Sequence, residues 1–238
     1  NNYYNNNINI TLNLIEVMKE NNCKNLIFSS SASVYSEVHK PPYFESNKLS
    51  YKNPYSHSKL IIEDILSNLS KNDKEWRICV LRYFNPVGSD KSNMIGNLSK
   101  NSTDLFSSIS RCLKNKSITL KIYGDDYNTN DGSAIRDYVH VTDIAKGHIC
   151  ALKNIKKSKF SVFNLGTGNG YSVLEIVKTF ETIIGYKLKK RIVSRRQGDV
   201  ESSFASVEKA KSILKWKSEN DLNQMCVDTI NWYSKLDN

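Results

Sequence analysis

A tyrosine and a lysine stand four residues apart in the segment YSHSK, Tyr55 to Lys59. Residues at this spacing share one face of a helix, so the two side chains are neighbours if a helix begins here. A lysine ammonium near a phenol favours the phenolate and lowers its pKa. Such a phenol could take and return a proton near neutral pH. The spacing alone is common on helix surfaces, so its meaning depends on the surrounding residues.

Three consecutive serines, with a fourth two residues further on, lie upstream in FSSSASVY, Phe28 to Tyr35. They follow the apolar run NLIF, residues 25–28, which we interpret as a strand buried in a parallel sheet. Ligands of such sheets bind outside the carboxyl ends of the strands. We therefore expect the serines just past a strand end, with Tyr55 facing the same crevice from the next helix. The alternative is a polar strand end with capping serines.

The elements that position these residues alternate between helix and strand. Hydrophobic periodicity predicts helices at 8–22 and 56–69 and strands at 25–28 and 77–84. A proline-rich loop is expected at 40–54, and a turn at NPVG after the second strand. The pattern predicts an α/β fold, a partial doubly wound (Rossmann-like) parallel sheet with a smaller α/β C-terminal substrate lobe.

The rest of the chain is less regular. It predicts helices at 104–115, 142–154, 172–184, 206–214 and 221–233, strands at 118–123 and 160–165, and a polar loop at 125–137. Ser172 and Glu175 have the spacing of a capping box at the start of the 172–184 helix.

Composition narrows the class of protein. The net charge of +10 comes from lysines spread along all 238 residues, with no dense basic block, which indicates solvated faces rather than a nucleic-acid partner. None of the five cysteines has metal-ligand spacing, so we expect reduced thiols, a cytoplasmic location and no metal. No apolar run approaches ~18 residues, so no membrane span is expected. The N-terminus does not read as a signal peptide.

Taken in order, SSSASVY, the proline loop, NPYSHSK and LRYFNPVG resemble the extended short-chain dehydrogenase/reductase family. The resemblance continues through DGSAIRDYVHVTDIAKGHICAL, FNLGTGNGYSVLEIV and RRQGDV, and covers nearly the whole chain. More narrowly, these blocks are similar to those of the UDP-glucose (UDP-galactose) 4-epimerases. The resemblance implies NAD as cofactor and UDP-galactose and UDP-glucose as substrates. It also implies an isomerase reaction through transient oxidation at C4 of the sugar.

The resemblance also implies roles for individual positions. Tyr55 is the implied catalytic base and acid, Lys59 binds the nicotinamide ribose and tunes Tyr55, and Ser31 helps to relay the proton. The implied cofactor-binding residues are Asn7, Ser29, Tyr55, Lys59 and Tyr83. The implied substrate-binding residues are Ser31, Ser33, Tyr83, Phe84, Asn85, Leu105, Lys121, Tyr123, Arg136, Arg196, Asp199 and Ser203. The arginines among them suit a diphosphate, which a guanidinium reads bidentately.

The same resemblance divides the chain. Residues 1–88 correspond to the C-terminal part of the NAD-binding domain, shared further with later segments, and residues 89–238 mainly to the nucleotide-sugar-binding lobe. The glycine-rich phosphate turn of the family is not found, because the glycines of LGTGNGYS, residues 165–172, have the wrong spacing and place. We therefore expect that roughly 80–90 residues of the NAD sheet precede this sequence in the family, or come from another chain.

Two departures from the family, and one difference from related dehydratases, bear on substrate and reaction. Thr103 and Asp104 stand where two asparagines are usual, and an aspartate should repel a diphosphate. The small Ser203 leaves room for an N-acetyl group, so UDP-N-acetylhexosamines are expected as further substrates. Ser31 to Ser33 replaces the Thr-Asp-Glu set of related dehydratases, which argues against dehydration.

Other interpretations stay open. The chain could be another nucleotide-sugar epimerase or reductase of the superfamily. It could be a non-catalytic UDP-sugar-binding fragment, since binding NAD without its phosphate turn is hard. A nucleic-acid-binding module has only the net charge in its favour.

The resemblance implies a homodimer through helices that include 56–69. The histidines, His148 among them, are assigned no role, and Asp143 is expected to be a helix cap.

Overall fold

A computed structural model describes residues 2–99 and 102–235. Contacts divide the chain into two compact units. The first unit comprises Asn1–Phe84, Lys146–Leu165 and Ala205–Lys217, and the second comprises Asn85–Ala145, Gly166–Phe204 and Ser218–Asn238. The chain first passes from one unit to the other between Phe84 and Asn85. The sequence prediction divides it after residue 88.

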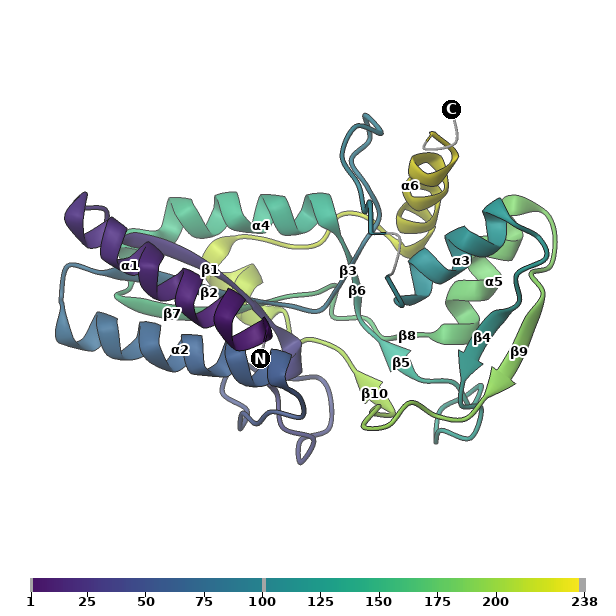
Figure 1. Ribbon diagram of the computed structural model, residues 1–238, viewed down its shortest axis with the longest axis horizontal. Helices are drawn as coiled ribbons and strands as arrows, with labels where there is room; N and C mark the ends of the chain where they lie inside the picture. Colours follow the sequence, from purple (N-terminus) through teal and green to yellow (C-terminus); the bar gives the residue numbers. More distant parts are fainter. Residues whose placement is uncertain (1, 100–101, 236–238) are drawn as a thin grey trace. The chain divides into compact units, whose positions relative to one another are not determined.

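A three-stranded parallel sheet forms the centre of the first unit. Its strands are β1 (Asn25–Ser31), β2 (Arg77–Tyr83) and β7 (Phe160–Leu165), in the order β1-β2-β7. In Figure 1, α1 (Ile10–Glu20) and α2 (Pro54–Asn72) lie on one side of this sheet and α4 (Val141–Asn154) lies on the other. The predicted α/β class with a Rossmann-like parallel sheet is confirmed.

Shorter helical turns complete the first unit. They are η1 (Tyr4–Asn9), η2 (Ala32–Val34), η3 (Ile155–Lys157) and η4 (Ala210–Leu214). Apolar side chains of α1, α2 and the sheet form a shared core of Ile15, Met18, Ile62, Leu66, Trp76, Ile78 and Val80. Burying a side chain of this size stabilises a fold by about 1.5–3 kcal/mol, so this core fixes α2 on the sheet.

Two of the predicted boundaries that are wrong in the first unit lie beside the predicted site residues. The strand predicted at 25–28 continues through the serines to Ser31, because Ser29–Ser31 pair in register with Leu81–Tyr83. Helix α2 begins at Pro54 rather than at residue 56. Proline suits the first helical position, and the Asn53 side chain accepts a hydrogen bond from the Ser56 amide in a complete capping box. Tyr55 is therefore the second residue of α2.

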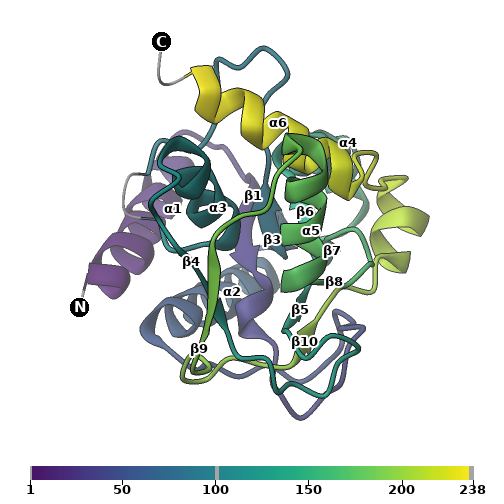
Figure 2. The same ribbon diagram turned by 90° about the vertical axis from the view of Figure 1, so that its right-hand side faces the viewer.

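The second unit combines three helices with short strands. The helices are α3 (Leu105–Lys114), α5 (Val173–Ile184) and α6 (Leu222–Lys235). Parallel pairs join β3 (Asn85–Val87) to β6 (Tyr138–His140) and β4 (Leu120–Tyr123) to β9 (Lys190–Val193), and β4 and β9 run side by side in Figure 2. A third sheet has the order β10 (Ser202–Ser203), β5 (Ile135–Arg136) and β8 (Tyr171–Ser172).

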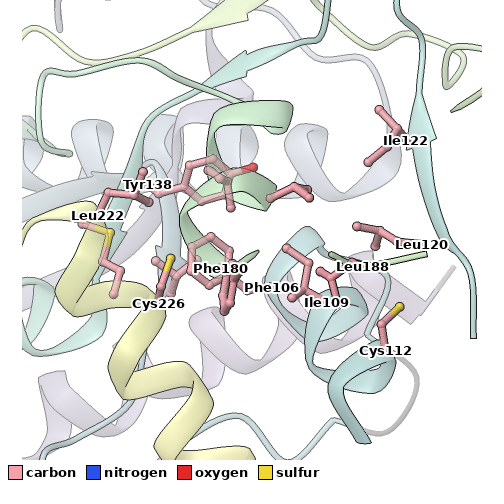
Figure 3. Packing of buried hydrophobic residues seen from close by; sticks show 14 residues of the cluster. Phe106, Ile109, Cys112, Leu120, Ile122, Tyr138, Phe180, Leu188, Leu222 and Cys226 are labelled. Carbon is pink, nitrogen blue, oxygen red and sulfur yellow. The ribbon is translucent and has the colours of Figure 1, made fainter. Parts of the chain in front are cut away.

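The core of the second unit lies among α3, α5 and α6 and includes side chains of β3, β4 and β6. Phe106 and Phe180 meet edge to face, with ring centroids 5.2 Å apart, and Figure 3 shows both rings inside the cluster. The predicted capping box at the start of α5 is confirmed, because Ser172 accepts from the Glu175 amide and Glu175 accepts from the Ser172 amide. The NPVG turn and the 125–137 loop are wrong in part, since they contain β3 and β5. Strands of two or three residues are too short to show a period of two.

The described residues contain no helix long and apolar enough to cross a membrane. The same residues hold no group of three or more histidine, cysteine or acidic side chains placed to bind a metal ion. All five cysteines are free thiols.

Candidate active site

Lys59 links the first turns of α2 to strand β1. Its ammonium donates a hydrogen bond to the Ser29 carbonyl at 2.9 Å and lies 5.8 Å from the centroid of the Tyr55 ring. It also lies 5.0 Å from the centroid of the Phe28 ring. Burial lowers the pKa of Lys59. An ammonium has three donors, so two stay available after the bond to Ser29.

Tyr83 lies in a chain of hydrogen bonds that crosses three elements. Its hydroxyl is 2.8 Å from the Ser29 hydroxyl and 2.6 Å from Nε2 of His148 in α4. Burial raises the pKa of Tyr83, so the phenol stays protonated near neutral pH. The sequence interpretation gave His148 no role, because no local pattern relates it to a tyrosine on another element.

Ser31 and Ser33 form a small hydroxyl cluster at the end of β1. The Ser31 hydroxyl oxygen accepts hydrogen bonds from the Ser33 amide at 3.2 Å and from the Ser33 hydroxyl at 3.0 Å. Ser31 thereby caps the turn η2. Its lone pairs are used in these bonds while its own proton stays available to donate. The capping and active-site interpretations of these serines are therefore compatible.

Asn7 supports the start of α2 from the neighbouring turn η1. Its side-chain amide donates to the Ser58 hydroxyl at 2.8 Å, and that hydroxyl donates to the Tyr55 carbonyl at 2.7 Å. Phe84 has a different environment. Its ring is buried in a cluster with Tyr35, so the structure assigns the ring to the core.

In the second unit, Arg136 and Asp199 are joined. The Arg136 guanidinium forms an ion pair with the Asp199 carboxylate and donates to the Val200 carbonyl at 2.6 Å. Arg136 lies in β5, and Ser203 of β10 is its register partner. These contacts bring three of the predicted substrate-binding residues together within this unit.

Arg196 and Tyr123 form a second pair in the same unit. The guanidinium carbon of Arg196 lies 4.1 Å from the centroid of the Tyr123 ring, a cation–π distance. Arg196 also donates to the Thr103 carbonyl at 3.0 Å. Lys121 lies two residues before Tyr123 on β4 and is exposed.

Asp104 caps α3 directly beside Thr103. One carboxylate oxygen accepts from the Ser107 amide at 2.9 Å, and the other accepts from the Ser107 hydroxyl at 2.6 Å. Burial alone would raise the pKa of Asp104, but hydrogen bonds from Ser102 and Ser107 lower it. The carboxylate is therefore ionised at neutral pH. Leu105 follows as the first residue of α3 and packs against the core.

The remaining predicted residue, Asn85, opens β3. It is exposed, and its amide donates to the Asp137 carbonyl at 2.9 Å. The sequence interpretation missed the buried Asp137. Its carboxylate accepts from the amide of Thr167 at 2.7 Å and from the amide of Gly168 at 3.0 Å. The glycine turn of LGTGNGYS therefore already binds an anion of the chain itself, which agrees with its rejection as a dinucleotide phosphate site.

The predicted site residues thus form two groups, one in each unit. The first group consists of Asn7, Ser29, Ser31, Ser33, Tyr55, Lys59, Tyr83 and Phe84. The second consists of Asn85, Leu105, Lys121, Tyr123, Arg136, Arg196, Asp199 and Ser203. The first group offers proton-carrying hydroxyls beside an ammonium, and the second offers guanidinium groups suited to phosphates.

Comparison with known proteins gives a family match. Residues 1–166 match the model of the NAD dependent epimerase/dehydratase family. UDP-glucose 4-epimerase 2 of Arabidopsis thaliana is 46% identical over 235 residues, which cover 98% of this chain and 67% of that protein.

Solved structures are similar over almost the whole chain. UDP-glucose-4-epimerase from Stenotrophomonas maltophila, with bound NAD and formylated UDP-arabinopyranose, has a TM-score of 0.96 and 37% identity, covering 99% of this chain and 71% of that chain. The UDP-Glc/GlcNAc 4-epimerase from Campylobacter jejuni has a TM-score of 0.82 and 35% identity, covering 98% of this chain and 71% of that chain.

Proposed function

The chain belongs to the NAD-dependent epimerase/dehydratase family, and we propose that it is an isomerase that interconverts UDP-galactose and UDP-glucose. The observation that carries this proposal is the seating of Lys59 between the Tyr55 ring and the Ser29 carbonyl. That geometry places a cation beside a phenol at the carboxyl edge of a parallel sheet, where ligands of this fold class bind. The relatives that match at 46% and 37% identity act as UDP-glucose 4-epimerases.

Proton transfer at the sugar 4-hydroxyl is the task of the first unit. Tyr55 takes this proton as the C–H bond at C4 breaks, and returns it when C4 is reduced from the other face. Lys59 favours the phenolate of Tyr55 during the transfer. Ser31 donates its free proton toward the same sugar oxygen. Placement of these groups lowers the barrier because the transfer needs no diffusive encounter.

The residues of the first unit fit the nicotinamide-ribose end of NAD. The two unused donors of Lys59 suit a ribose diol, and the exposed Ser29 with the half-buried Tyr83 offers hydroxyls beside them. Asn7 holds the helix turn behind Tyr55. NAD supplies the acceptance and return of hydride that the reaction requires.

The second unit supplies the groups for the uridine diphosphate. We propose that Arg196 and Arg136 bind the diphosphate, while Asp199 orients Arg136. Asn85 and Leu105 complete the contacts to the substrate, and Lys121 and Tyr123 flank the uracil. Phe84 contributes through its main chain, since its ring is buried.

The direct test is conversion of UDP-galactose to UDP-glucose with NAD added. The assay uses this chain and, in parallel, the same chain preceded by a glycine-rich NAD-binding segment from a relative. Turnover in either protein supports the proposal. UDP-galactose binding without turnover in both, with NAD bound by the extended protein, would favour a non-catalytic UDP-sugar-binding role and overturn the enzyme assignment.

We further propose that UDP-N-acetylhexosamines are substrates. Ser203 is a small residue opposite Arg136 in the β10–β5 register, and a small side chain leaves space for an N-acetyl group. The related Campylobacter jejuni enzyme is described as acting on both glucose and N-acetylglucosamine sugars. Normal turnover of UDP-galactose with none of UDP-N-acetylglucosamine would contradict this, and Ser203→Tyr should abolish only the second activity.

A homodimer is the proposed assembly. Three side chains at helical spacing on α1 are exposed although apolar, at 63% for Ile10, 46% for Leu14 and 53% for Val17. Such a stripe suits a second copy of the same helix. Val17→Asp should convert a dimer to a monomer in analytical ultracentrifugation, whereas a monomeric unaltered protein would refute the assembly.

We also propose a cytoplasmic location, because five free thiols suit a reducing compartment. Cell fractionation checks this, and recovery of the protein with secreted material would contradict it.

A further inference from the structure

A row of polar side chains crosses the buried sheet of the first unit. Ser30 of β1, Arg82 of β2 and Asn164 of β7 are register partners, and all three are almost fully buried. Glu63 of α2 is 4% exposed and Arg82 is 3% exposed. Charged residues at this depth are rare unless they are paired, so their partners matter.

Glu63 and Arg82 form a two-pronged ion pair. One carboxylate oxygen of Glu63 lies 3.1 Å from Nε of Arg82, and the other lies 2.6 Å from Nη2. The Ser30 hydroxyl donates to the same carboxylate at 2.5 Å. Burial alone would lower the pKa of Arg82, but its bonds to Glu63 outweigh this and raise it. The pair ties α2 to both β1 and β2.

The other side of Arg82 holds the segment that leads into α2. Its Nη1 donates to the Tyr35 hydroxyl at 3.2 Å and to the Glu45 carbonyl at 3.3 Å. Burial raises the pKa of Tyr35 to about 12, so its phenol donates in turn to the Asn164 side chain at 2.6 Å. The Glu45 carboxylate accepts a hydrogen bond from the backbone amide of Asn164 at 2.9 Å. The network therefore spans the approach to α2 as well as the helix itself.

Glu63, Ser30 and Arg82 each adjoin a proposed catalytic or cofactor-binding residue. Glu63 lies one helical turn after Lys59, on the same face of α2. Ser30 lies between Ser29 and Ser31, and Arg82 directly precedes Tyr83. The chain is thus held on both sides of the Tyr55–Lys59 turn.

Stability alone does not explain a buried ion pair. Removing two charges from water costs several kcal/mol per ion, and apolar replacements of similar volume are often neutral or stabilising. We propose that Glu63 and Arg82 are positioning residues for the reaction, which fix α2 against β1 and β2 and so hold Tyr55 and Lys59 in place. This rests on the proposed function, in which Tyr55 and Lys59 carry the proton transfer.

The test replaces both charges at once with apolar side chains, in the variant Glu63→Leu/Arg82→Met. Because no single charge is left buried, the protein should fold with an unfolding midpoint close to that of the unaltered chain. We expect kcat for UDP-galactose to fall by about tenfold to hundredfold, with KM changed by less than about threefold. Arg82→Lys keeps the positive charge but loses the two-pronged guanidinium contact. Its kcat should lie between those of the unaltered protein and the double variant. A folded double variant with unaltered kcat would overturn the proposal.

A matched control comes from the second unit. Glu181 is 5% exposed and accepts bonds from the Leu188 amide and from the ammonium groups of Lys187 and Lys190. Glu181→Leu also removes a buried carboxylate with cationic partners, none of which is a proposed site residue. Its kcat should match that of the unaltered protein even where its stability falls.

Backbone hydrogen exchange tests positioning without any activity. The amides of residues 55–59 should exchange faster in the Glu63→Leu/Arg82→Met variant, while those of α5 should not change. If the unaltered chain lacks epimerase activity, the proposed function fails, yet this measurement still decides whether the pair orders the start of α2. Equal exchange in both proteins would refute the positioning role.

Discussion

Replacing Tyr55 by phenylalanine removes one oxygen atom and leaves the first turn of α2 in place. Because the phenol is the proposed proton carrier, Tyr55→Phe should lower kcat by about 10²–10⁴, with little change in KM. Steady-state kinetics with UDP-galactose measure both. Tyr51→Phe is the control, since Tyr51 is exposed, stacks on His57 and lies outside the proposed proton path. Equal loss in both variants would contradict the role of Tyr55.

Asp104 stands where the family resemblance implies an asparagine. Its ionised carboxylate caps α3 next to Thr103, which accepts a bond from Arg196. A negative charge there opposes a diphosphate held by Arg196.

Asp104→Asn keeps a capping side chain and removes that charge. We expect UDP to bind up to about fivefold tighter, which corresponds to ~1 kcal/mol, and the gain should shrink at high salt. Isothermal titration calorimetry with UDP measures the change. Asp221→Asn, at the cap of α6, is the matched control and should leave UDP binding unaltered. Weaker binding by Asp104→Asn would show that the carboxylate assists the site.

At the scale of elements, the start of α2 sets where Tyr55 lies. Asn53 and Ser56 form a capping box there, and Ser172 and Glu175 form one at α5. Asn53→Ala and Ser172→Ala should each lower stability by about 1 kcal/mol, as loss of a cap does. Only Asn53→Ala should also lower kcat, because only its helix carries Tyr55. Thermal unfolding measures the loss of stability, and steady-state kinetics measure the loss of kcat. A normal kcat in Asn53→Ala would show that the cap does not affect catalysis.

Longer elements agree more closely with their predicted bounds than short ones. Helix α5 and strand β7 have the predicted residues, apart from the cap position, because each spans several periods of its apolar pattern. β10 has only two residues, and its pairing with β5 depends on distant chain. No local sequence pattern predicts a strand of two residues. Serines in β1 were expected to follow the strand, but their backbone groups pair with β2 regardless of the polar side chains.

For the protein as a whole, acid stability depends on a buried histidine. His140 is fully buried, its Nε2 lies 3.1 Å from Asp228, and its Nδ1 lies 2.7 Å from the Thr142 hydroxyl. Burial lowers the pKa of His140, and the charges of Asp228 and Asp143 offset this only in part. The unfolded chain, with the ordinary value of 6.5, therefore takes up this proton first as the pH falls. The stability from neutral His140 is present above about pH 6.5 and is lost below it.

His140→Gln removes the titrating group and can keep a donor toward Asp228. Its unfolding midpoint should depend less on pH between about 5 and 7 than that of the unaltered protein, although it is lower at pH 8. Differential scanning calorimetry across this range measures the difference. His39→Gln, on a loop, should retain the full pH dependence. If the midpoint of His140→Gln were lower by the same amount at every pH, the loss of stability in acid would come from other groups.

Sequence alone determined the α/β class, the family resemblance and the residues most suited to chemistry. Tyr55 with Lys59, the serines of SSSASVY, and Arg136 and Arg196 were chosen from residue type, short spacing and resemblance. Only the tertiary structure revealed that His148 bonds to Tyr83, that Arg82 pairs with Glu63, and that Asp137 binds the glycine turn. His148 and Tyr83 are 65 positions apart in the chain. Periodicity and capping report interactions within a few residues, whereas these contacts exist because packed helices and strands bring distant side chains together.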